Sequence, residues 1–170
     1  MCVGHDDTLY IGDGRALHCY DYSDTANADG KLFTNVLLLP ENYIIRSIIK
    51  IQPRSLVIFA DKRGNYGGEA TAFFWDYLSL DPYQIENLYD SQVVTSFEYK
   101  GTIGCLTNDY GGHSKLKIFD GNEFVVLTRF SDMESTEGYT TIGGIDVRDN
   151  EIYVHRFGNN KGLIYKKDIQ

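Results

Sequence analysis

The sequence predicts an all-β chain of about four small antiparallel sheets, and three repeating features carry that prediction. The first is a short strand-like run, whose first apolar residues are Leu9, Leu56, Ile103 and Ile152, at spacings of 47, 47 and 49 residues. The second is a two-residue turn signal directly before each run, and the third is an aromatic strand after it. A fixed period of this length is typical of a repeat architecture.

The turn signals indicate a hairpin in each repeat. They are the pairs Asp6-Asp7, Pro53-Arg54, Lys100-Gly101 and Asp149-Asn150. Gly and Asn tolerate the positive φ that tight hairpins need, so these pairs suit two-residue turns. Strand-like runs precede three of them, at 44–51, 93–99 and 140–147. Each repeat is therefore expected to begin with two paired strands, a and b.

A third strand, c, follows in every repeat and a fourth, d, is readable in three of them. Strand c is expected at 17–21, 73–76, 116–120 and 163–166, and strand d at 32–39, 84–89 and 124–130. Acidic residues recur in one column at the end of strand c, as Asp21, Asp76 and Asp120. Because Asp side chains readily accept hydrogen bonds from nearby turn amides, we expect this column to cap the turn between strands c and d.

Units of four short antiparallel strands at this period resemble the blades of the β-propeller superfamily, over nearly the whole chain. Trp75-Asp76 ends strand c as the WD dipeptide does in WD40 proteins, although the other blades have different pairs. Gly67-Gly68 is similar to the kelch double glycine but occurs once. The resemblance implies a single β-propeller region over 1–170, with blades at approximately 1–40, 41–90, 91–132 and 133–170.

The blades at the two ends are expected to be incomplete. Aligned on the repeat, Met1 falls inside strand a of the first blade, and the sequence stops shortly after strand c of the last. Three arrangements are open: part of a larger propeller of about six to eight blades, a small four-bladed ring, or a ring completed by a second copy or another chain. Open strand edges invite pairing, so we expect protein partners or copies of the chain to bind there.

Composition narrows the function class. A net charge of −8 and a pI near 4.9 argue against nucleic acid or an anionic membrane as the main partner. No apolar run approaches the ~20 residues of a membrane span, and no secretory signal begins the chain, so a cytoplasmic or virion location is expected. The cysteines, Cys2, Cys19 and Cys105, are expected to be small buried hydrophobic residues. No metal site or cofactor is expected.

A catalytic role is not expected. Propeller glycosidases place two or three carboxylates in a central funnel lined by strands a, and here those strands offer Ser47, Ser96, Glu98 and Asp146. We interpret these as solvated residues. The expected function is a non-enzymatic structural or interaction module. Its divergent blades look like the propeller domains of phage tail and neck structural proteins, which implies a component of a larger assembly. The alternative is a carbohydrate-binding or glycoside-hydrolysing propeller.

One loop differs from the repeat and supplies the candidate binding residues. The segment Asp61–Glu69 is an insertion between strands b and c of the second blade, and it places Lys62, Arg63 and Tyr66 in a glycine-rich frame. Loops on rigid scaffolds often carry binding residues. The other interpretation is that the insertion is simply tolerated.

Overall fold

A computed structural model describes most of the chain as strands. The described residues are 2–3, 8–21, 31–52, 55–64, 68–76, 84–109, 113–130, 141–148, 151–158 and 161–168. Within them the chain forms two compact units, residues 1–93 and 94–170, and each is considered by itself. No helix in the described part of the chain is long and apolar enough to span a membrane.

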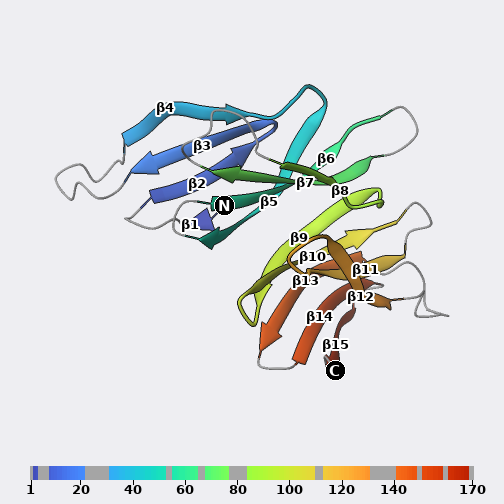
Figure 1. The fold of residues 1–170 in the computed structure, drawn as a ribbon. Helices are drawn as coiled ribbons and strands as arrows, with labels where there is room; N and C mark the ends of the chain where they lie inside the picture. The colour runs from blue at the N-terminus through green and yellow to red at the C-terminus, as the bar shows by residue number, and fades with distance from the viewer. Residues whose placement is uncertain are drawn as a thin grey trace. The chain divides into compact units, whose positions relative to one another are not determined.

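The first unit contains two antiparallel sheets of four strands each (Figure 1). The first sheet has the order β1 (Cys2–Val3), β2 (Thr8–Asp13), β3 (Ala16–Asp21) and β4 (Lys31–Leu38). The second has the order β5 (Tyr43–Gln52), β6 (Ser55–Lys62), β7 (Glu69–Asp76) and β8 (Gln84–Asn87). Each strand pairs with its neighbour in the sequence, so both sheets are simple meanders.

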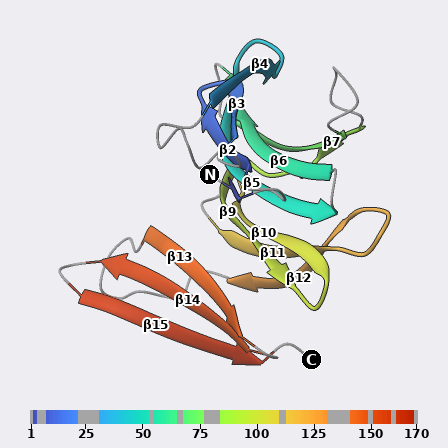
Figure 2. The ribbon, with the colours of Figure 1, turned by 90° about the vertical axis from the view of Figure 1, so that its left-hand side faces the viewer.

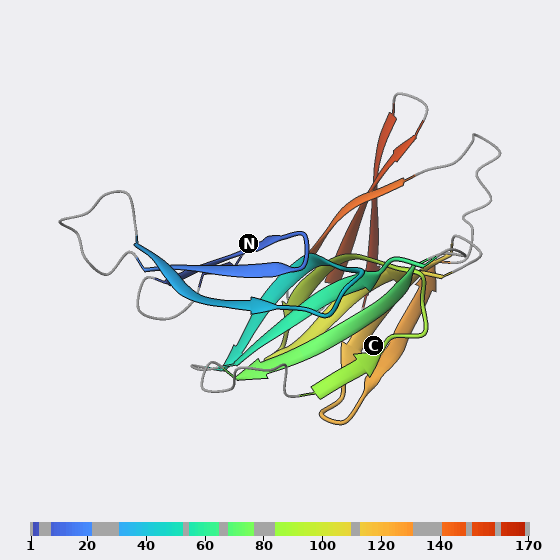
Figure 3. The same ribbon diagram turned by 90° about the horizontal axis from the view of Figure 1, so that it is seen from above.

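The second unit repeats this topology, except that its last sheet has three strands in the described residues. The third sheet has the order β9 (Gln92–Tyr99), β10 (Thr102–Asn108), β11 (Ser114–Phe119) and β12 (Phe124–Phe130). The fourth has the order β13 (Thr141–Arg148), β14 (Glu151–Gly158) and β15 (Lys161–Asp168). Figure 2 shows β15 at one edge of this sheet, and Figure 3 shows the twist of the same three strands, coloured orange to red.

The predicted fold class, all-β with four-stranded antiparallel sheets, is confirmed, and each sheet lies within one of the four expected blade ranges. The largest difference in boundaries is in the second sheet. Strand β6 continues to Lys62 and β7 begins at Glu69, and these two residues are paired in the ladder. The insertion between strands b and c is therefore shorter than expected, because its ends belong to the sheet.

The hairpin predicted at Lys100-Gly101 is confirmed by its backbone angles. Lys100 has φ 48° and Gly101 has φ 76°. Positive φ at both central residues is the requirement of a tight turn that matches the twist of its two strands. The other three predicted turn pairs, at 6–7, 53–54 and 149–150, lie outside the described residues.

The first and second sheets share one hydrophobic core. It is built from alternating residues of both sheets, and its buried members are Tyr10, Leu17, Leu37, Leu39, Ile48, Leu56, Ile58, Ala60, Phe73 and Trp75. The rings of Tyr10 and Trp75 meet edge to face with centroids 6.5 Å apart. Cys19 packs at the margin of this core, and Cys105 in the other unit is fully buried. The expected burial is confirmed for Cys105, whereas Cys19 is only partly buried and the side chain of Cys2 lies outside the described residues.

The third and fourth sheets share a second core. Its buried members are Phe97, Tyr99, Leu106, Leu116, Ile152 and Val154. Because side chains alternate between the faces of a strand, Ile152 and Val154 face this core while Tyr153 and His155 lie on the opposite face of β14. The fourth sheet therefore has one apolar, covered face and one outer face of different composition.

Candidate functional site

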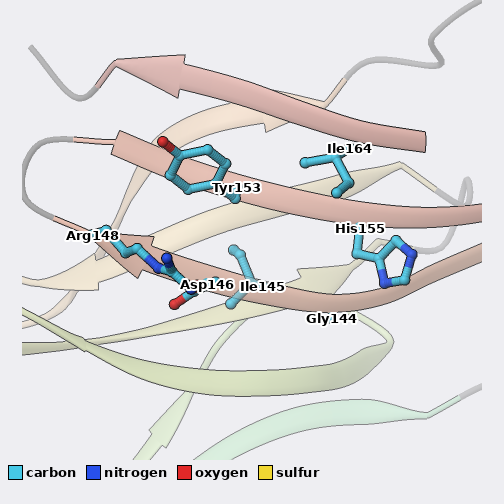
Figure 4. Close-up of a pocket in the computed structure, with 7 residues that line it drawn as sticks. All are labelled: Gly144, Ile145, Asp146, Arg148, Tyr153, His155 and Ile164. Carbon is cyan, nitrogen blue, oxygen red and sulfur yellow. The ribbon is translucent and has the colours of Figure 1, made fainter. Parts of the chain in front are cut away.

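The outer face of the fourth sheet carries a hollow of about 450 Å³. It is lined by residues from three neighbouring strands, Gly144, Ile145, Asp146, Arg148, Tyr153, His155 and Ile164 (Figure 4). The volume falls within the range of small-ligand pockets. Its lining combines two opposite charges, a phenol, an imidazole and the aliphatic side chain of Ile164, so it offers both polar and apolar contacts.

The polar lining distinguishes the fourth sheet from the third. Aligning the turn pairs places Tyr99 of the third sheet in the same column as Arg148 of the fourth, and the strand ladders align Leu116 with Ile164. At four equivalent positions the third sheet has Phe97, Tyr99, Leu106 and Leu116, and the fourth has Asp146, Arg148, His155 and Ile164. The third sheet uses these positions as core, whereas three of the four in the last sheet are polar or charged.

Two ion pairs order this face. Arg148 donates from Nε to Asp146 Oδ2 at 2.7 Å, on strand β13. Lys166 of β15 pairs with Glu151 of β14, and the Tyr153 hydroxyl donates to the same carboxylate. All of these groups are partly or mostly exposed, so the pairs orient side chains rather than adding much stability.

The second pair shifts two pKa values. The Lys166 ammonium, and after it the Tyr153 hydroxyl, hold the pKa of the Glu151 carboxyl below its ordinary value. The same hydrogen bond to Glu151 raises the pKa of Tyr153. At neutral pH the face therefore presents a carboxylate, an ammonium and a neutral phenol in one connected group.

Strand β15 forms the edge of this face. It pairs with β14 along all eight of its residues, and in the described residues no strand lies along its other edge. The equivalent strands of the other three sheets, β3, β7 and β11, are paired on both sides. Ile164, on the outer face of β15, is 72% exposed.

The candidates in the insertion of the second blade lie apart from this face in the sequence and belong to the other unit. Lys62 is the last residue of β6, with Nζ 3.9 Å from Glu69 Oε2 and 6.0 Å from the centroid of the Tyr43 ring. Arg63 is exposed, and its backbone N–H donates to Asn42 O at 2.7 Å. Tyr66 lies outside the described residues. The structure thus places Lys62 and Arg63 at the base of the insertion, and their role in binding stays a prediction.

Asp61, expected at the start of the insertion, has a different position. It is buried at 4% exposure in β6, where it accepts a hydrogen bond from Arg46 Nε at 2.5 Å and another from Val93 N at 2.6 Å. Burial raises the pKa of the Asp61 carboxyl, and the hydrogen bonds from Val93 and Arg46 act against that rise. Asp61 is a structural link within the first unit.

The residues considered for glycoside chemistry are distributed over three sheets. Ser47 lies on β5, Ser96 and Glu98 on β9, and Asp146 on β13. The Asp146 carboxylate is held in its ion pair with Arg148. A carbohydrate function stays a prediction.

The expected cap between strands c and d is confirmed at Asp120. Its carboxylate accepts the backbone N–H groups of Glu123 at 2.9 Å and Asn122 at 2.8 Å, and these bonds, the one from Glu123 first, lower the pKa of Asp120. The side chain of Asp21 lies outside the described residues. Among the described residues no three His, Cys, Asp or Glu side chains are grouped so as to hold a metal ion.

Comparison with known proteins supports the fold. No family model matches the sequence, and no curated protein matches it. A solved structure, the β-propeller domain of Cps50 (Swd1) from Myceliophteria thermophila, superposes with a TM-score of 0.63 at 11% sequence identity. The match covers 94% of this chain and 52% of the other, so this chain spans about half the length of that domain. The chain has the fold of a β-propeller, as its repeats predicted.

Proposed function

We propose that the chain is a non-enzymatic interaction module, which takes its place in a larger assembly through the fourth sheet. The observation that carries the proposal is the composition of that sheet's outer face. Three of four positions that form core in the third sheet are polar or charged in the fourth, where Asp146 and Arg148 form an ion pair. The face ends at a strand edge with no described neighbour. Strand edges and mixed polar–apolar faces are typical contact surfaces between proteins.

The propeller domain of Cps50 (Swd1) supports this proposal only through its fold, because one fold hosts many functions. The function must therefore come from the site. A rigid sheet with an ordered set of charged side chains needs little rearrangement to bind a partner, and this reduces the entropic cost of association.

The test is the size of the native particle in the cells that express the chain. Gel filtration of a gentle extract, followed by immunodetection, should place the chain well above its own mass of 19.3 kDa. Chemical cross-linking with mass spectrometry should then map partner contacts to 141–168. Elution of the chain as a 19.3 kDa monomer would refute the proposal.

Within this class we propose a component of a viral particle, such as a phage tail or neck, with a location in the virion or the cytoplasm. The support is the likeness of the divergent blades to the propellers of such structural proteins. Proteomic analysis of purified particles tests it. Finding the chain there at a fixed ratio to a major structural protein supports the proposal, and its absence from intact particles overturns it.

Carbohydrate binding is the second candidate, and one observation favours it. The hollow places the Tyr153 ring beside Asp146 and Arg148, and sugars bind by stacking on aromatic rings and hydrogen bonding to charged groups (Figure 4). A glycan array gives a direct test. Saturable binding that is lost in Tyr153→Ala but kept in Tyr89→Ala, an exposed tyrosine of the other unit, would favour this function.

A further inference from the structure

We infer that the hollow on the outer face of the fourth sheet binds an uncharged aromatic ring, supplied by a tyrosine or tryptophan side chain of a partner protein. The inference deepens the proposed function and rests on it, because it names the group by which the partner would be held. It is carried by the residues that line the hollow and by the hydrogen bonds that orient them.

The depth of the hollow comes from a glycine. Gly144 of β13 is paired with His155 of β14, and His155 is paired with Ile164 of β15, so the three residues form one row across the sheet. A Cβ at Gly144 would have no atom within 4 Å, which leaves open space where another residue would have a side chain. Ile164, which is 72% exposed, lies at the other end of the row. The row therefore provides room for a ring and an apolar contact beside it.

The walls of the hollow include planar groups, two of which are held in place. The hydroxyl of Tyr153 donates to Glu151, and Arg148 Nε donates to Asp146 Oδ2 at 2.7 Å. These bonds orient the Tyr153 ring and the Arg148 guanidinium before a ligand binds (Figure 4). Aromatic rings pack edge to face or offset on other rings, and guanidinium groups stack on ring faces. The walls therefore favour an aromatic ring over an aliphatic side chain.

The charges on this face select an uncharged ligand. The whole chain has a net charge of −8, but the described carboxylates, lysine and arginine of this face form two ion pairs, Asp146 with Arg148 and Glu151 with Lys166. A charged ligand would lose water without finding an opposite charge that is still unpaired, which costs free energy. A phenol or an indole avoids this cost and still offers a polar group to the rim of the hollow.

A partner protein is the source that fits such a ring. Tyrosine and tryptophan are enriched among the residues that dominate protein–protein binding, where they fill pockets surrounded by less important contacts. A second copy of the chain is disfavoured, because each copy has a net charge of −8 and two copies repel each other. The expected partner is therefore a different protein that presents an exposed tyrosine or tryptophan.

The first experiment measures the binding of single blocked amino acids to the full chain by NMR. The probes are N-acetyl-tyrosinamide and N-acetyl-tryptophanamide, and the corresponding leucine, glutamate and lysine compounds are the controls. The aromatic probes should bind saturably with dissociation constants of about 1 mM, and should shift the amide signals of 144–146 and 153–155. Each control should bind about fivefold more weakly or less. Equal binding of the leucine and aromatic compounds would overturn the inference.

Four variants locate the ring. Gly144→Leu fills the open space and should weaken binding of the aromatic probes by about tenfold or more. Tyr153→Leu removes a planar wall and should weaken binding by about two- to tenfold, whereas Tyr153→Phe keeps the ring and should keep the affinity. Glu98→Leu adds a leucine at an exposed position of β9 and should change nothing. If Gly144→Leu does not fold, the two Tyr153 variants test the same site, and equal affinities of these two would contradict the inference.

The second experiment tests whether the ring belongs to a partner. In gel filtration of cell extracts, Gly144→Leu should move the chain from the large particle toward 19.3 kDa, and Glu98→Leu should not. If Gly144→Leu stays in the particle but no longer binds the aromatic probes, the hollow serves a free small molecule and the inference fails. Concentration-dependent dimers of the purified chain that are lost in both Gly144→Leu and Tyr89→Ala, a variant at an 81% exposed tyrosine, would identify a second copy as the source and would also overturn it.

The outcomes also separate this inference from the proposed function. A large native particle whose cross-links reach 141–168, together with no preference among the probes, would retain the interaction module and overturn the aromatic-ring inference. Saturable binding of methyl glycosides in place of the aromatic probes would support the carbohydrate candidate and would likewise overturn it. A native monomer of 19.3 kDa would remove the proposed function on which the inference rests.

Discussion

Replacing Gly104 with alanine tests how tightly the core of residues 94–170 is packed. Gly104 lies on β10, where a Cβ would meet the ring of Phe97 and would lie 2.7 Å from Lys117 O. The Phe97 ring is itself held in the core, and the carbonyl belongs to the paired strand β11. Overpacking of a core costs about 1–3 kcal/mol, and the upper half of that range is expected here because neither neighbour moves freely.

The assay is equilibrium unfolding in urea, followed by circular dichroism and tyrosine fluorescence. For a small domain the free energy of unfolding falls by about 1–3 kcal/mol per molar urea, so Gly104→Ala should lower the midpoint by about 1 M. Gly144→Ala is the matched control. Gly144 is also on a strand of this unit, but a Cβ there would have no atom within 4 Å. Its midpoint should stay within about 0.3 M of the original protein.

Equal midpoints for the two variants would refute the reasoning, because they would show that the strand b position under Phe97 has room for a methyl group. A change in the slope of the transition for Gly104→Ala would indicate an altered denatured state instead. In that case hydrogen exchange within β10 and β11 would compare the stability of Gly104→Ala with that of the original protein. An intact but strained core would still show weaker protection of these amides in the variant.

Three further predictions concern the carboxylates. Asp61→Ala should lower the free energy of unfolding by about 1–3 kcal/mol, since it leaves a buried backbone N–H without its acceptor; thermal unfolding measures this, and a loss below 0.5 kcal/mol would contradict it. The pKa of Asp120 is lowered, so its stabilisation is present above pH 3.8 and is lost as the pH falls through the lowered pKa. Asp120→Ala should therefore destabilise the chain at pH 6 but hardly at pH 2, and equal effects at both pH values would count against the cap. Lys166→Met should raise the pKa of Glu151 more than Tyr153→Phe does, because Lys166 is the larger cause of its shift; an NMR titration of the Glu151 carboxyl gives both values.

Features determined by neighbouring residues were predictable from the sequence. The turn at Lys100-Gly101 follows from the low cost of positive φ at glycine, and the cap at Asp120 follows from the reach of a short carboxylate to the next amides. The repeat spacing predicted the four sheets for a similar reason, because each strand pairs with its neighbour in the sequence. In such a meander local pattern and final topology agree.

Features determined by distant contacts were not predictable. Asp61 was expected at the start of the insertion between strands b and c, yet it accepts a hydrogen bond from Val93, 32 residues away. The face of the fourth sheet is an intermediate case. The alternation of apolar and polar residues along β14 was visible in the sequence, but which neighbour covers the apolar side is decided by the packing of the third sheet.

The outer face of the fourth sheet has a consequence for how such an array can grow. In a run of stacked repeats each unit provides the packing surface for the next. The third sheet packs against the fourth through four large apolar side chains. At the equivalent positions the fourth sheet has Asp146, Arg148 and His155, where a packing surface for another blade would need apolar side chains. A further blade added after β15 should therefore fail to pack against the fourth sheet. It would pack only if these three side chains were first replaced by the equivalent side chains of the third sheet. In an engineered array this sheet would act as a natural cap.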